Sequence, residues 1–329
     1  FRMIEGNDIK FSIIVLNWNG IHFLKDCFDS IFAQNGCEYE VILVDNNSSD
    51  NSVDFTKKNY PAVKILKLKE NIGYTGANNA ASKIAKGKYL IFLNNDVRLD
   101  PNYIEELHNF LQKNPQAKIV ATKEYSYDGK VFVSQSDGID FLGYPCKYQK
   151  GKIHYAPGCA FVIEKELFRK LGGFDEKMFI FHEELDICWR AYLIGEKPYL
   201  ANRCKFYHYT GGVITPWSLQ RRYLSERNNI RSVLVNYSVP TLLLILPIYI
   251  FVNLCEILYL LFTNQWRVII YAYLRAWYDN LKDYRNILRR HKEIQSKRIV
   301  DDITYLKNVC LVFGKWQNFK RVRGDLKFR

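Results

Sequence analysis

The feature that most constrains the fold is a regular alternation of short apolar runs with helical segments between residues 11 and 123. The apolar runs predict buried strands at residues 11–16, 40–45, 63–68, 89–93 and 118–122. The segments between them predict helices at residues 21–32, 52–59, 77–85 and 103–111. Alternating strands and helices predict an α/β fold with a mostly parallel central sheet, covered by helices on both faces.

Polar segments follow four of the predicted strands. They read "NWNG" (17–20), "DNNSSD" (45–50), "KENIGYTGANN" (69–79) and "NNDVRLDP" (94–101). Any one of them fits an ordinary turn, because turns favour Asn, Asp and Gly. Four in succession indicate a ligand site at the carboxyl ends of the strands, where open α/β sheets bind ligands. Neither a Gly-x-Gly-x-x-Gly pattern nor a Gly-Lys-Ser/Thr loop is present, which argues against a dinucleotide dehydrogenase and a P-loop nucleotidase.

Two acids end predicted strands and are candidate ligand contacts. Asp45 can accept hydrogen bonds from a base or ribose, and an Asx-turn explains it equally well. Asp96 follows the buried "YLIFL" strand, where a carboxylate can hold a divalent cation that neutralises a diphosphate. A helix-capping role for Asp96 is less suitable, because Asp100 stands directly before Pro101.

A third acidic group lies in "FHEELDICWRAY" (181–192), at the start of a predicted helix over about 183–195. The zinc-protease pattern fails here because position 186 is Asp and not His. Glu183, Asp186 and Arg190 share one helix face, and Asp186 can pair with Arg190. Acids also favour the positive end of a helix dipole, which explains part of the cluster. Glu184 points away from that face and is the carboxylate left for a general base.

The net charge of +13 is concentrated in the C-terminal part of the chain. Residues 1–215 hold 27 Lys and Arg against 26 Asp and Glu, whereas residues 263–329 hold 16 against 6. A nearly neutral body argues against a nucleic-acid-binding protein and indicates no nucleic-acid partner. The eight cysteines include no Cys-x-x-Cys pair, which predicts free thiols in a reducing, cytosolic compartment.

Six segments in order carry a resemblance to a known family. They are "FSIIVLNWNG", "VILVDNNSSDNSV", "NIGYTGANNAA", "YLIFLNNDV", "GCAFVIEKELFRKLGGFDEKMFIFHEELDICWRA" and "FYHYTGG". Over roughly residues 11–230 the chain resembles glycosyltransferase family 2 enzymes of the type A fold, and most of all the rhamnosyltransferase-like members that build surface glycans. The resemblance implies an inverting, metal-dependent transferase that uses a nucleotide-diphosphate sugar, such as dTDP-rhamnose or a UDP-sugar.

The resemblance also assigns residues to roles. It implies that the nucleotide sugar is contacted by polar and glycine residues at the strand ends, namely Asn17, Asp45, Asn71, Gly73, Gly76, Asn78 and Asn95. Asp96 matches the last acid of the family's Asp-x-Asp motif and would hold Mg²⁺ or Mn²⁺. His208 matches a histidine that completes the metal site in related enzymes; without the match, a buried structural histidine would be the default. The family's Glu-Asp pair falls on Glu183-Glu184, which makes Glu184 the catalytic base.

Two positions depart from the family pattern. Asn94 replaces the first acid of Asp-x-Asp, so that one carboxylate remains there for the cation. Glu184 stands where the family has Asp, one methylene shorter. Asn94 leaves open an alternative function, a catalytically impaired nucleotide-sugar-binding protein or scaffold of a glycan assembly complex.

The C-terminal part predicts a membrane-associating region. Residues 239–262 hold no Lys or Arg and are long enough to span a bilayer, but Pro240, Pro247, Asn253 and Glu256 argue against a simple span. After them comes a predicted apolar stripe, made of Trp266, Ile269, Ile270, Tyr273, Trp277, Leu281, Tyr284 and Leu288. The basic residues that flank this stripe are Arg267, Arg275, Lys282, Arg285 and Arg289. Interfacial aromatics with basic flanks suit anionic headgroups, although a helical subdomain packed on the protein body would show the same stripe.

We therefore expect a catalytic domain at residues 1–230 and a helical membrane-associating region at 231–329, apolar and then basic. The expected location is the cytoplasmic face of the cell membrane, with peripheral or monotopic attachment. A hairpin formed by residues 239–290 would dip into one leaflet. The expected partners are a nucleotide-sugar donor, a glycan or polyprenyl-linked glycan acceptor and an anionic membrane surface.

Overall fold

The computed structural model describes residues 10–134, 138–146, 153–209, 218–310 and 313–315. The chain forms two compact units, each built from several segments. The sheet unit comprises residues 1–136, 156–179 and 197–212, and the helical unit comprises 137–155, 180–196 and 213–329. Part of the "FYHYTGG" motif and residues 316–329 of the basic tail lie outside the described residues.

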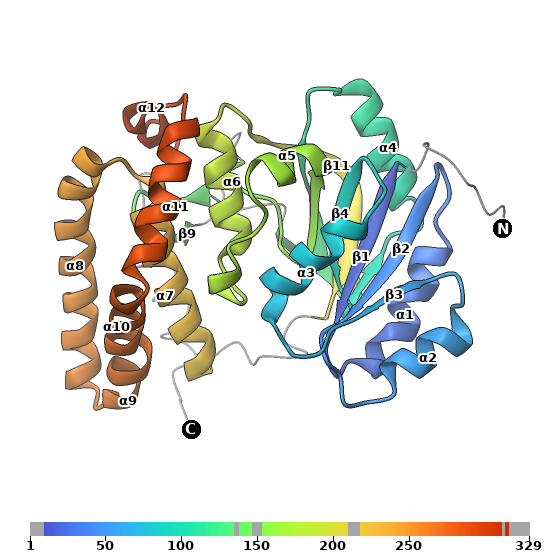
Figure 1. The fold of residues 1–329 in the computed structure, drawn as a ribbon, viewed down its shortest axis with the longest axis horizontal. Helices are drawn as coiled ribbons and strands as arrows, with labels where there is room; N and C mark the ends of the chain where they lie inside the picture. The colour runs from blue at the N-terminus through green and yellow to red at the C-terminus, as the bar shows by residue number, and fades with distance from the viewer. Residues whose placement is uncertain (1–9, 135–137, 147–152, 210–217, 311–312, 316–329) are drawn as a thin grey trace. The chain divides into compact units, whose positions relative to one another are not determined.

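The sheet unit is built on one nine-stranded sheet with both parallel and antiparallel neighbours (Figure 1). Its strands are β1 (Phe11–Asn17), β2 (Tyr39–Asp45), β3 (Lys64–Lys67), β4 (Tyr89–Asn94), β5 (Val97–Leu99), β6 (Ile119–Ser126), β7 (Phe132–Ser134), β10 (Ala160–Glu164) and β11 (Pro198–His208). The order is β3-β2-β1-β4-β10-β6-β11-β5, with β7 beside β6. Neighbouring β1, β2, β3 and β4 are parallel, and β10 runs antiparallel to β4 and β6. The predicted fold class is confirmed.

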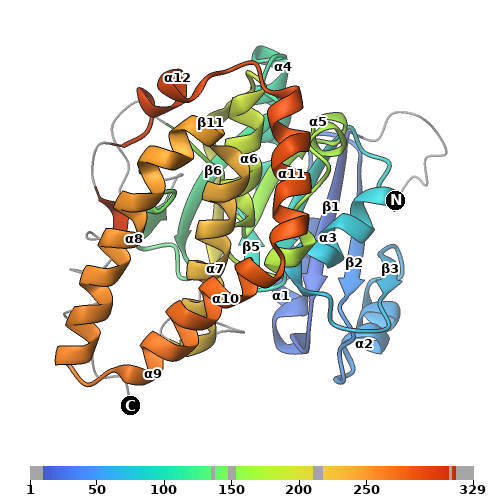
Figure 2. The ribbon, with the colours of Figure 1, turned by 60° about the vertical axis from the view of Figure 1, so that its left-hand side comes forward.

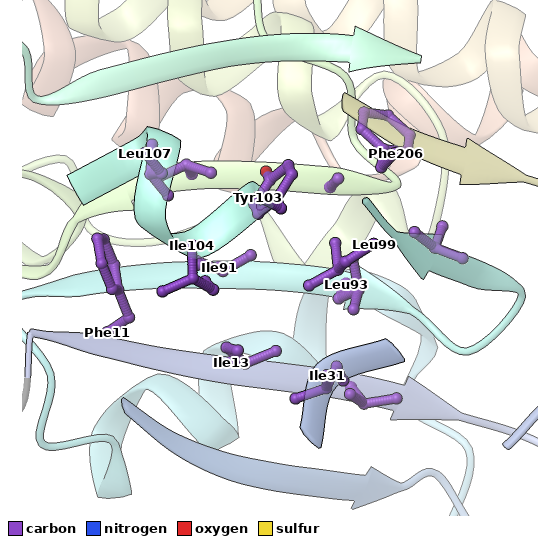
Figure 3. Packing of buried hydrophobic residues seen from close by; sticks show 14 of the residues in the cluster. Phe11, Ile13, Ile31, Ile91, Leu93, Leu99, Tyr103, Ile104, Leu107 and Phe206 are labelled. Carbon is purple, nitrogen blue, oxygen red and sulfur yellow. The ribbon is translucent and has the colours of Figure 1, made fainter. Parts of the chain in front are cut away.

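Helices cover both faces of this sheet. They are α1 (Ile21–Phe32), α2 (Ser52–Asn59), α3 (Gly73–Ile84), α4 (Tyr103–Lys113), α5 (Lys165–Lys170) and the short 3₁₀ turn η1 (Glu176–Met178). On one face Ile13 and Leu93 pack with Ile31 of α1 and Ile104 of α4 (Figure 3). On the other face Phe92 packs against Phe168 of α5 and against Phe174. Burial on both faces explains why the strands read as continuous apolar runs.

The helical unit contains α6, the helices from α7 onward and a small hairpin (Figure 2). Its elements are β8 (Gly138–Ile139), β9 (Pro145–Cys146), α6 (Glu183–Leu193), α7 (Leu219–Asn236), α8 (Val239–Phe262), α9 (Trp266–Val268), the π-helix η2 (Ile269–Leu274), α10 (Arg275–Lys282), α11 (Tyr284–Lys297) and α12 (Asp302–Leu306). Its core gathers Trp189 of α6, Val233 of α7 and Tyr249 of α8. α8 continues through Pro247, so this proline does not interrupt the helix.

The predicted apolar stripe after residue 265 is divided between two faces. Ile269 and Tyr273 are buried in the helical unit, whereas Ile270 and Leu281 are exposed. Residues 269–274 form a π-helix, whose wider turn rotates the following residues relative to α-helical spacing. The prediction of one continuous apolar face is therefore wrong.

Candidate active site

The carboxyl ends of β1, β2 and β4 lie level with one another. The strand register pairs Asn17 with Asp45 and Leu16 with Asn94. This alignment gathers the polar segments that follow the strands at one edge of the sheet. The candidate residues at this edge belong to the sheet unit, and Glu184 belongs to the helical unit.

Asn17 and Asn95 hold each other in place at this edge. The Asn95 amide donates a hydrogen bond of 2.7 Å to Asn17 Oδ1, and Asn17 Nδ2 donates one of 3.1 Å to Ser48 Oγ. Gly20 lies against this pair, and a Cβ there would stand 2.0 Å from Asn95 Nδ2. This close approach leaves room for glycine at position 20 and for no larger residue. The hydrogen bonds hold the Asn17–Asn95 pair in place at this edge of the sheet.

One carboxylate oxygen of Asp45 accepts a hydrogen bond within a turn, and the other accepts none from the described residues. Its Oδ2 accepts a hydrogen bond from the Ser48 backbone at 3.3 Å, which forms the Asx-turn considered from the sequence. Its Oδ1 is buried and has no hydrogen-bond partner among the described residues. A buried, unpaired carboxylate oxygen is costly unless a ligand donates to it. The two readings of Asp45 are therefore compatible.

The "NIGYTGAN" segment is mostly helix and not loop. The predicted helix at 77–85 begins earlier, because α3 starts at Gly73 and includes Gly76 and Asn78. The Asn46 side chain fixes this start: its Nδ2 donates a hydrogen bond of 2.8 Å to Asn71 Oδ1, and its Oδ1 accepts one of 3.0 Å from Ile72 N. Because α3 starts at Gly73, the backbone amides of its first turn, which have no partner inside the helix, lie within the "NIGYTGAN" segment.

Gly73 is required by its backbone conformation, whereas Asn78 has a buried side chain with unpaired polar atoms. Gly73 has φ +76°, and a Cβ there would lie 2.4 Å from the Phe179 carbonyl oxygen, so the position requires glycine. Asn78 is fully buried in α3, and neither its Oδ1 nor its Nδ2 has a hydrogen-bond partner among the described residues. An amide with both ends unpaired fits a site for a polar ligand better than a structural role.

His208, at the end of β11, lies between two carboxylates. Its Nδ1 is 2.8 Å from Glu124 Oε1, and its Nε2 is 3.4 Å from Asp96 Oδ1. Burial by itself lowers the pKa of His208, but the neighbouring Cys159, Asp96 and Glu124 raise this pKa well above its usual value. The imidazole and the carboxylates thus form one charged cluster in the sheet unit.

This cluster fits a divalent cation. The ligand atoms of Glu124, Cys159 and His208 lie within 4.8 Å of one another, and the buried Asp96 Oδ1 lies 3.4 Å from His208 Nε2. Carboxylate oxygens and an imidazole suit Mn²⁺ at least as well as Mg²⁺, which prefers oxygen ligands. Glu124 supplies a carboxylate on the Nδ1 side of His208, whereas Asp96 lies on the Nε2 side.

The acidic group at the start of α6 is arranged as its spacing predicted. Arg190 pairs with Asp186 at 2.8 Å, and both side chains are buried. Ser232 and Asn236 of α7 also donate to Asp186, at 3.2 and 3.1 Å. These contacts use the buried face of α6 and leave Glu184, which is partly exposed, outside the ion pair.

The turn into α6 is strained and is held by α7. Phe181 and His182 both have positive φ, +72° and +76°, which side chains other than glycine rarely adopt. Asn228 of α7 donates hydrogen bonds to the carbonyl oxygens of Ile180 and Phe181 at 3.0 and 2.7 Å. Strain of this kind persists where surrounding contacts fix it, and it concentrates at functional sites.

The environment of Glu184 suits a base. Burial raises the pKa of Glu184 to about 7, while its own backbone amide and the positive charge of Arg221 act in the opposite direction. Arg221, in the first turn of α7, stacks over the Phe181 ring at 4.7 Å. Burial and then the Glu184 charge raise the pKa of Glu183 well above its usual value.

Sequence reasoning missed Asn46, Glu124, Arg221 and Asn228. Asn46 stands directly after Asp45 in a strand-end segment, and that position was a usable signal. The other three lie more than thirty residues from the groups that they contact or influence, so only the folded chain brings them there.

The sheet order, the covering helices and the polar strand edge define the type A glycosyltransferase fold. A solved structure of GalNAc-T7 with UDP, GalNAc and Mn²⁺ matches with a TM-score of 0.56 at 19% identity, over 70% of this chain and 48% of that one. Residues 12–172 match the model of glycosyl transferase family 2, and this segment is a glycosyltransferase family 2 domain.

Two curated relatives show how far the similarity extends. An uncharacterised glycosyltransferase of Rickettsia typhi is 29% identical over 52% of this chain and 55% of its own length. The O-antigen biosynthesis protein RfbC of Myxococcus xanthus is 28% identical over 54% of this chain and 16% of its own length. The chain thus spans about half the length of the first relative and much less of the second.

Proposed function

We propose that this chain is an inverting glycosyltransferase that moves a sugar from a nucleotide-diphosphate sugar to a hydroxyl group of a glycan acceptor. The observation that carries the proposal is the set of buried, unpaired polar atoms of Asp45 and Asn78 within a family 2 domain. Each of these atoms lacks a partner among the described residues, and a polar donor substrate would supply one.

The family motifs assign the donor contacts. The proposed nucleotide-sugar ligands are Asn17, Asp45, Asn71, Gly73, Gly76, Asn78 and Asn95. Asn17 and Asn95 support this role as a fixed pair, and Asn71 supports it through Asn46. Asp96 and His208 would hold Mg²⁺ or Mn²⁺, joined by Glu124. The ion would neutralise the charge of the departing diphosphate.

Glu184 is the proposed general base. It takes the proton of the acceptor hydroxyl while that oxygen forms a bond to the anomeric carbon. The bond between the anomeric carbon and the phosphate oxygen breaks, and its electron pair leaves with the nucleoside diphosphate. Attack opposite the leaving group inverts the anomeric configuration. A pKa of about 7 supports this role, because the carboxylate is then both available and basic near neutral pH.

The donor and acceptor are proposed by class. The donor is dTDP-rhamnose or a UDP-sugar, and the acceptor is a lipid-linked or surface glycan. The similarity to an O-antigen biosynthesis protein supports a surface glycan, and the structural match to a UDP complex supports a nucleotide sugar. Residues 1–230 would provide catalysis and residues 231–329 attachment to the cytoplasmic face of the membrane. Helix α8 is long and apolar enough to cross a bilayer by length and composition, which supports membrane attachment.

Asn94 favours a second candidate, a nucleotide-sugar-binding scaffold without turnover. Asn94 ends β4 where the family has an acid, so that Asp96 is the one acid left in that motif. Turnover of labelled nucleotide sugars, measured with and without EDTA, separates the two candidates. An enzyme turns over donor and loses activity with EDTA, whereas a scaffold shows binding alone.

The variant Glu184→Gln tests the proposed base. The amide keeps the size of the side chain but accepts no proton, so we expect transfer to fall by about 10²–10⁴-fold. Nucleotide binding should stay nearly unchanged, because the proposed donor contacts are other residues. Binding is measured as the rise in melting temperature with uridine and thymidine nucleotides, since a ligand of the native state stabilises it.

The matched control is Glu166→Gln, which removes an exposed acid of α5. This variant should keep wild-type transfer. Full activity of Glu184→Gln would remove Glu184 from the mechanism. Absence of a melting shift with every uridine and thymidine nucleotide would contradict the donor class.

A further inference from the structure

The outward face of α8 is an apolar surface that none of the described residues covers. Leu243, Leu244, Phe251 and Phe262 are 71, 72, 66 and 90% exposed, and the helix contains no Lys or Arg. Only 17% of its most apolar window is buried. Contiguous apolar surface of this kind marks an interaction site. Its occupant can be a bilayer that α8 crosses, a single leaflet, or another protein.

The inward face of α8 is polar and is held by ion pairs. Tyr249, Asn253 and Glu256 repeat at helical spacing on this face. The Tyr249 hydroxyl lies 3.0 Å from that of Tyr144, and Glu256 pairs with Arg222 of α7 and with Lys315, the latter at 3.0 Å. Lys315 also reaches Glu226 at 3.2 Å. These polar contacts bind the middle and second half of α8 to the rest of the helical unit.

Charged side chains that pair with α8 argue against a crossing geometry. Val233 near the end of α7 packs in one cluster with Ile245 of α8, and Tyr223 near the start of α7 packs in another with Ile257. Arg222 of α7 and Lys315 both pair with Glu256 of α8, and α7 also carries Glu226, Arg227 and Arg231. A bilayer that surrounded α8 would also enclose these charges, and ionised groups at the bilayer centre are costly.

The hairpin partner of α8 carries the groups that bind lipid headgroups. The segment from α9 to α11 exposes Trp266, Tyr271, Tyr278 and Tyr284. It also exposes the basic residues Arg267, Arg275, Lys282, Arg285 and Arg289. The turn from α8 into α9 joins the two arms of the hairpin (Figure 2). Aromatic and basic side chains beside an apolar surface complement an anionic membrane interface.

We infer that α8 lies in the plane of the membrane, with its outward face in the acyl region of one leaflet. This inference rests on the membrane attachment proposed above and fixes its geometry. The polar face stays with the helical unit, and the outward residues from 244 to 262 lie at one depth. A crossing helix would instead spread these residues over about 27 Å, at 1.5 Å per residue.

Depth measurements along α8 test the inference. The exposed Cys255 is labelled with an environment-sensitive fluorophore in the full chain. The variants Leu244→Cys, Phe251→Cys and Phe262→Cys, each with Cys255→Ser, carry the same label. Vesicles of phosphatidylcholine and phosphatidylglycerol contain lipids with quenchers at two depths. We expect all four labels to be quenched at one shallow acyl depth, within the width of a helix turn.

The other outcomes overturn the inference in distinguishable ways. Deep quenching at position 251 with shallow quenching at 244 and 262 would show a crossing helix, while attachment itself would stand. No quenching at any position would contradict membrane attachment as well. If all labels report an apolar environment without vesicles, and the protein is a dimer in solution, the outward face of α8 contacts a second copy of the chain. A label at Lys58→Cys on α2 should stay unquenched, and Cys255→Ser measures labelling of other thiols.

Discussion

At the scale of single residues, Glu184 sets the pH dependence that we expect. Burial raises its pKa to about 7, and a general base works only when deprotonated. The value of kcat/KM should therefore rise with pH up to about 7 and level off above it. The positive charge of Arg221 lowers the same pKa. Arg221→Gln should therefore shift the rising limb of the plot of kcat/KM against pH to higher pH. Initial rates over the pH range measure both.

The comparison for this shift is Arg169→Gln. Arg169 is an exposed cation of α5 that pairs with Glu166. Its removal should leave the limb in place. A limb that stays unchanged in Arg221→Gln, or moves to lower pH, would contradict the influence of Arg221 on Glu184.

At the scale of secondary-structure elements, α7 positions the start of α6. Asn228 bonds two carbonyl groups of the strained turn before Glu184, whereas the adjacent Asn229 bonds the Leu142 carbonyl at 3.2 Å. Both side chains are buried, so replacing either by Ala should cost about 1–3 kcal/mol of stability. Only Asn228→Ala should also lower kcat, because only it releases the turn.

Melting temperatures and steady-state rates of the two variants separate positioning from stability. Equal melting losses with a lower kcat for Asn228→Ala alone are expected. Equal kcat values in both variants would show that α7 stabilises the unit without setting the geometry of Glu184.

At the scale of the whole molecule, charge is segregated along the chain. Residues 263–329 carry a net charge of +10, against +1 for residues 1–215. A basic residue near an anionic membrane contributes about 1 kcal/mol, so replacing Arg267, Arg285 and Arg289 by Gln should weaken vesicle binding roughly 100-fold. Flotation with phosphatidylglycerol vesicles at several salt concentrations measures this loss, and binding of the wild type should fall as salt rises.

The matched variant replaces Lys57, Lys58 and Lys83, three exposed cations of the sheet unit, and removes the same charge. It should bind vesicles like the wild type. Equal losses in both variants would mean that net charge, and not the segment 266–289, controls binding.

The sequence by itself determined five of the nine described strands of the sheet and the family motifs. The helices at Ile21–Phe32 and Ser52–Asn59 have the predicted bounds, because apolar periodicity is a local signal. The pairing of Asp186 with Arg190 was also predictable, since both lie on one helix. The register that pairs Asn17 with Asp45 depends on the order of the strands in the sheet, and the sequence does not state this order.

Only the tertiary structure decided which side chains meet across long separations. Glu124 reaches His208, and Asn228 reaches the turn at Phe181, through contacts that no periodicity encodes. The π-helix at 269–274 divided a stripe that α-helical spacing predicted as one face. The polar residues of α8 read as obstacles in a membrane span until α7 and Lys315 supplied their partners. A buried charge is stable only beside its counter-charge, and folding alone brings the two together.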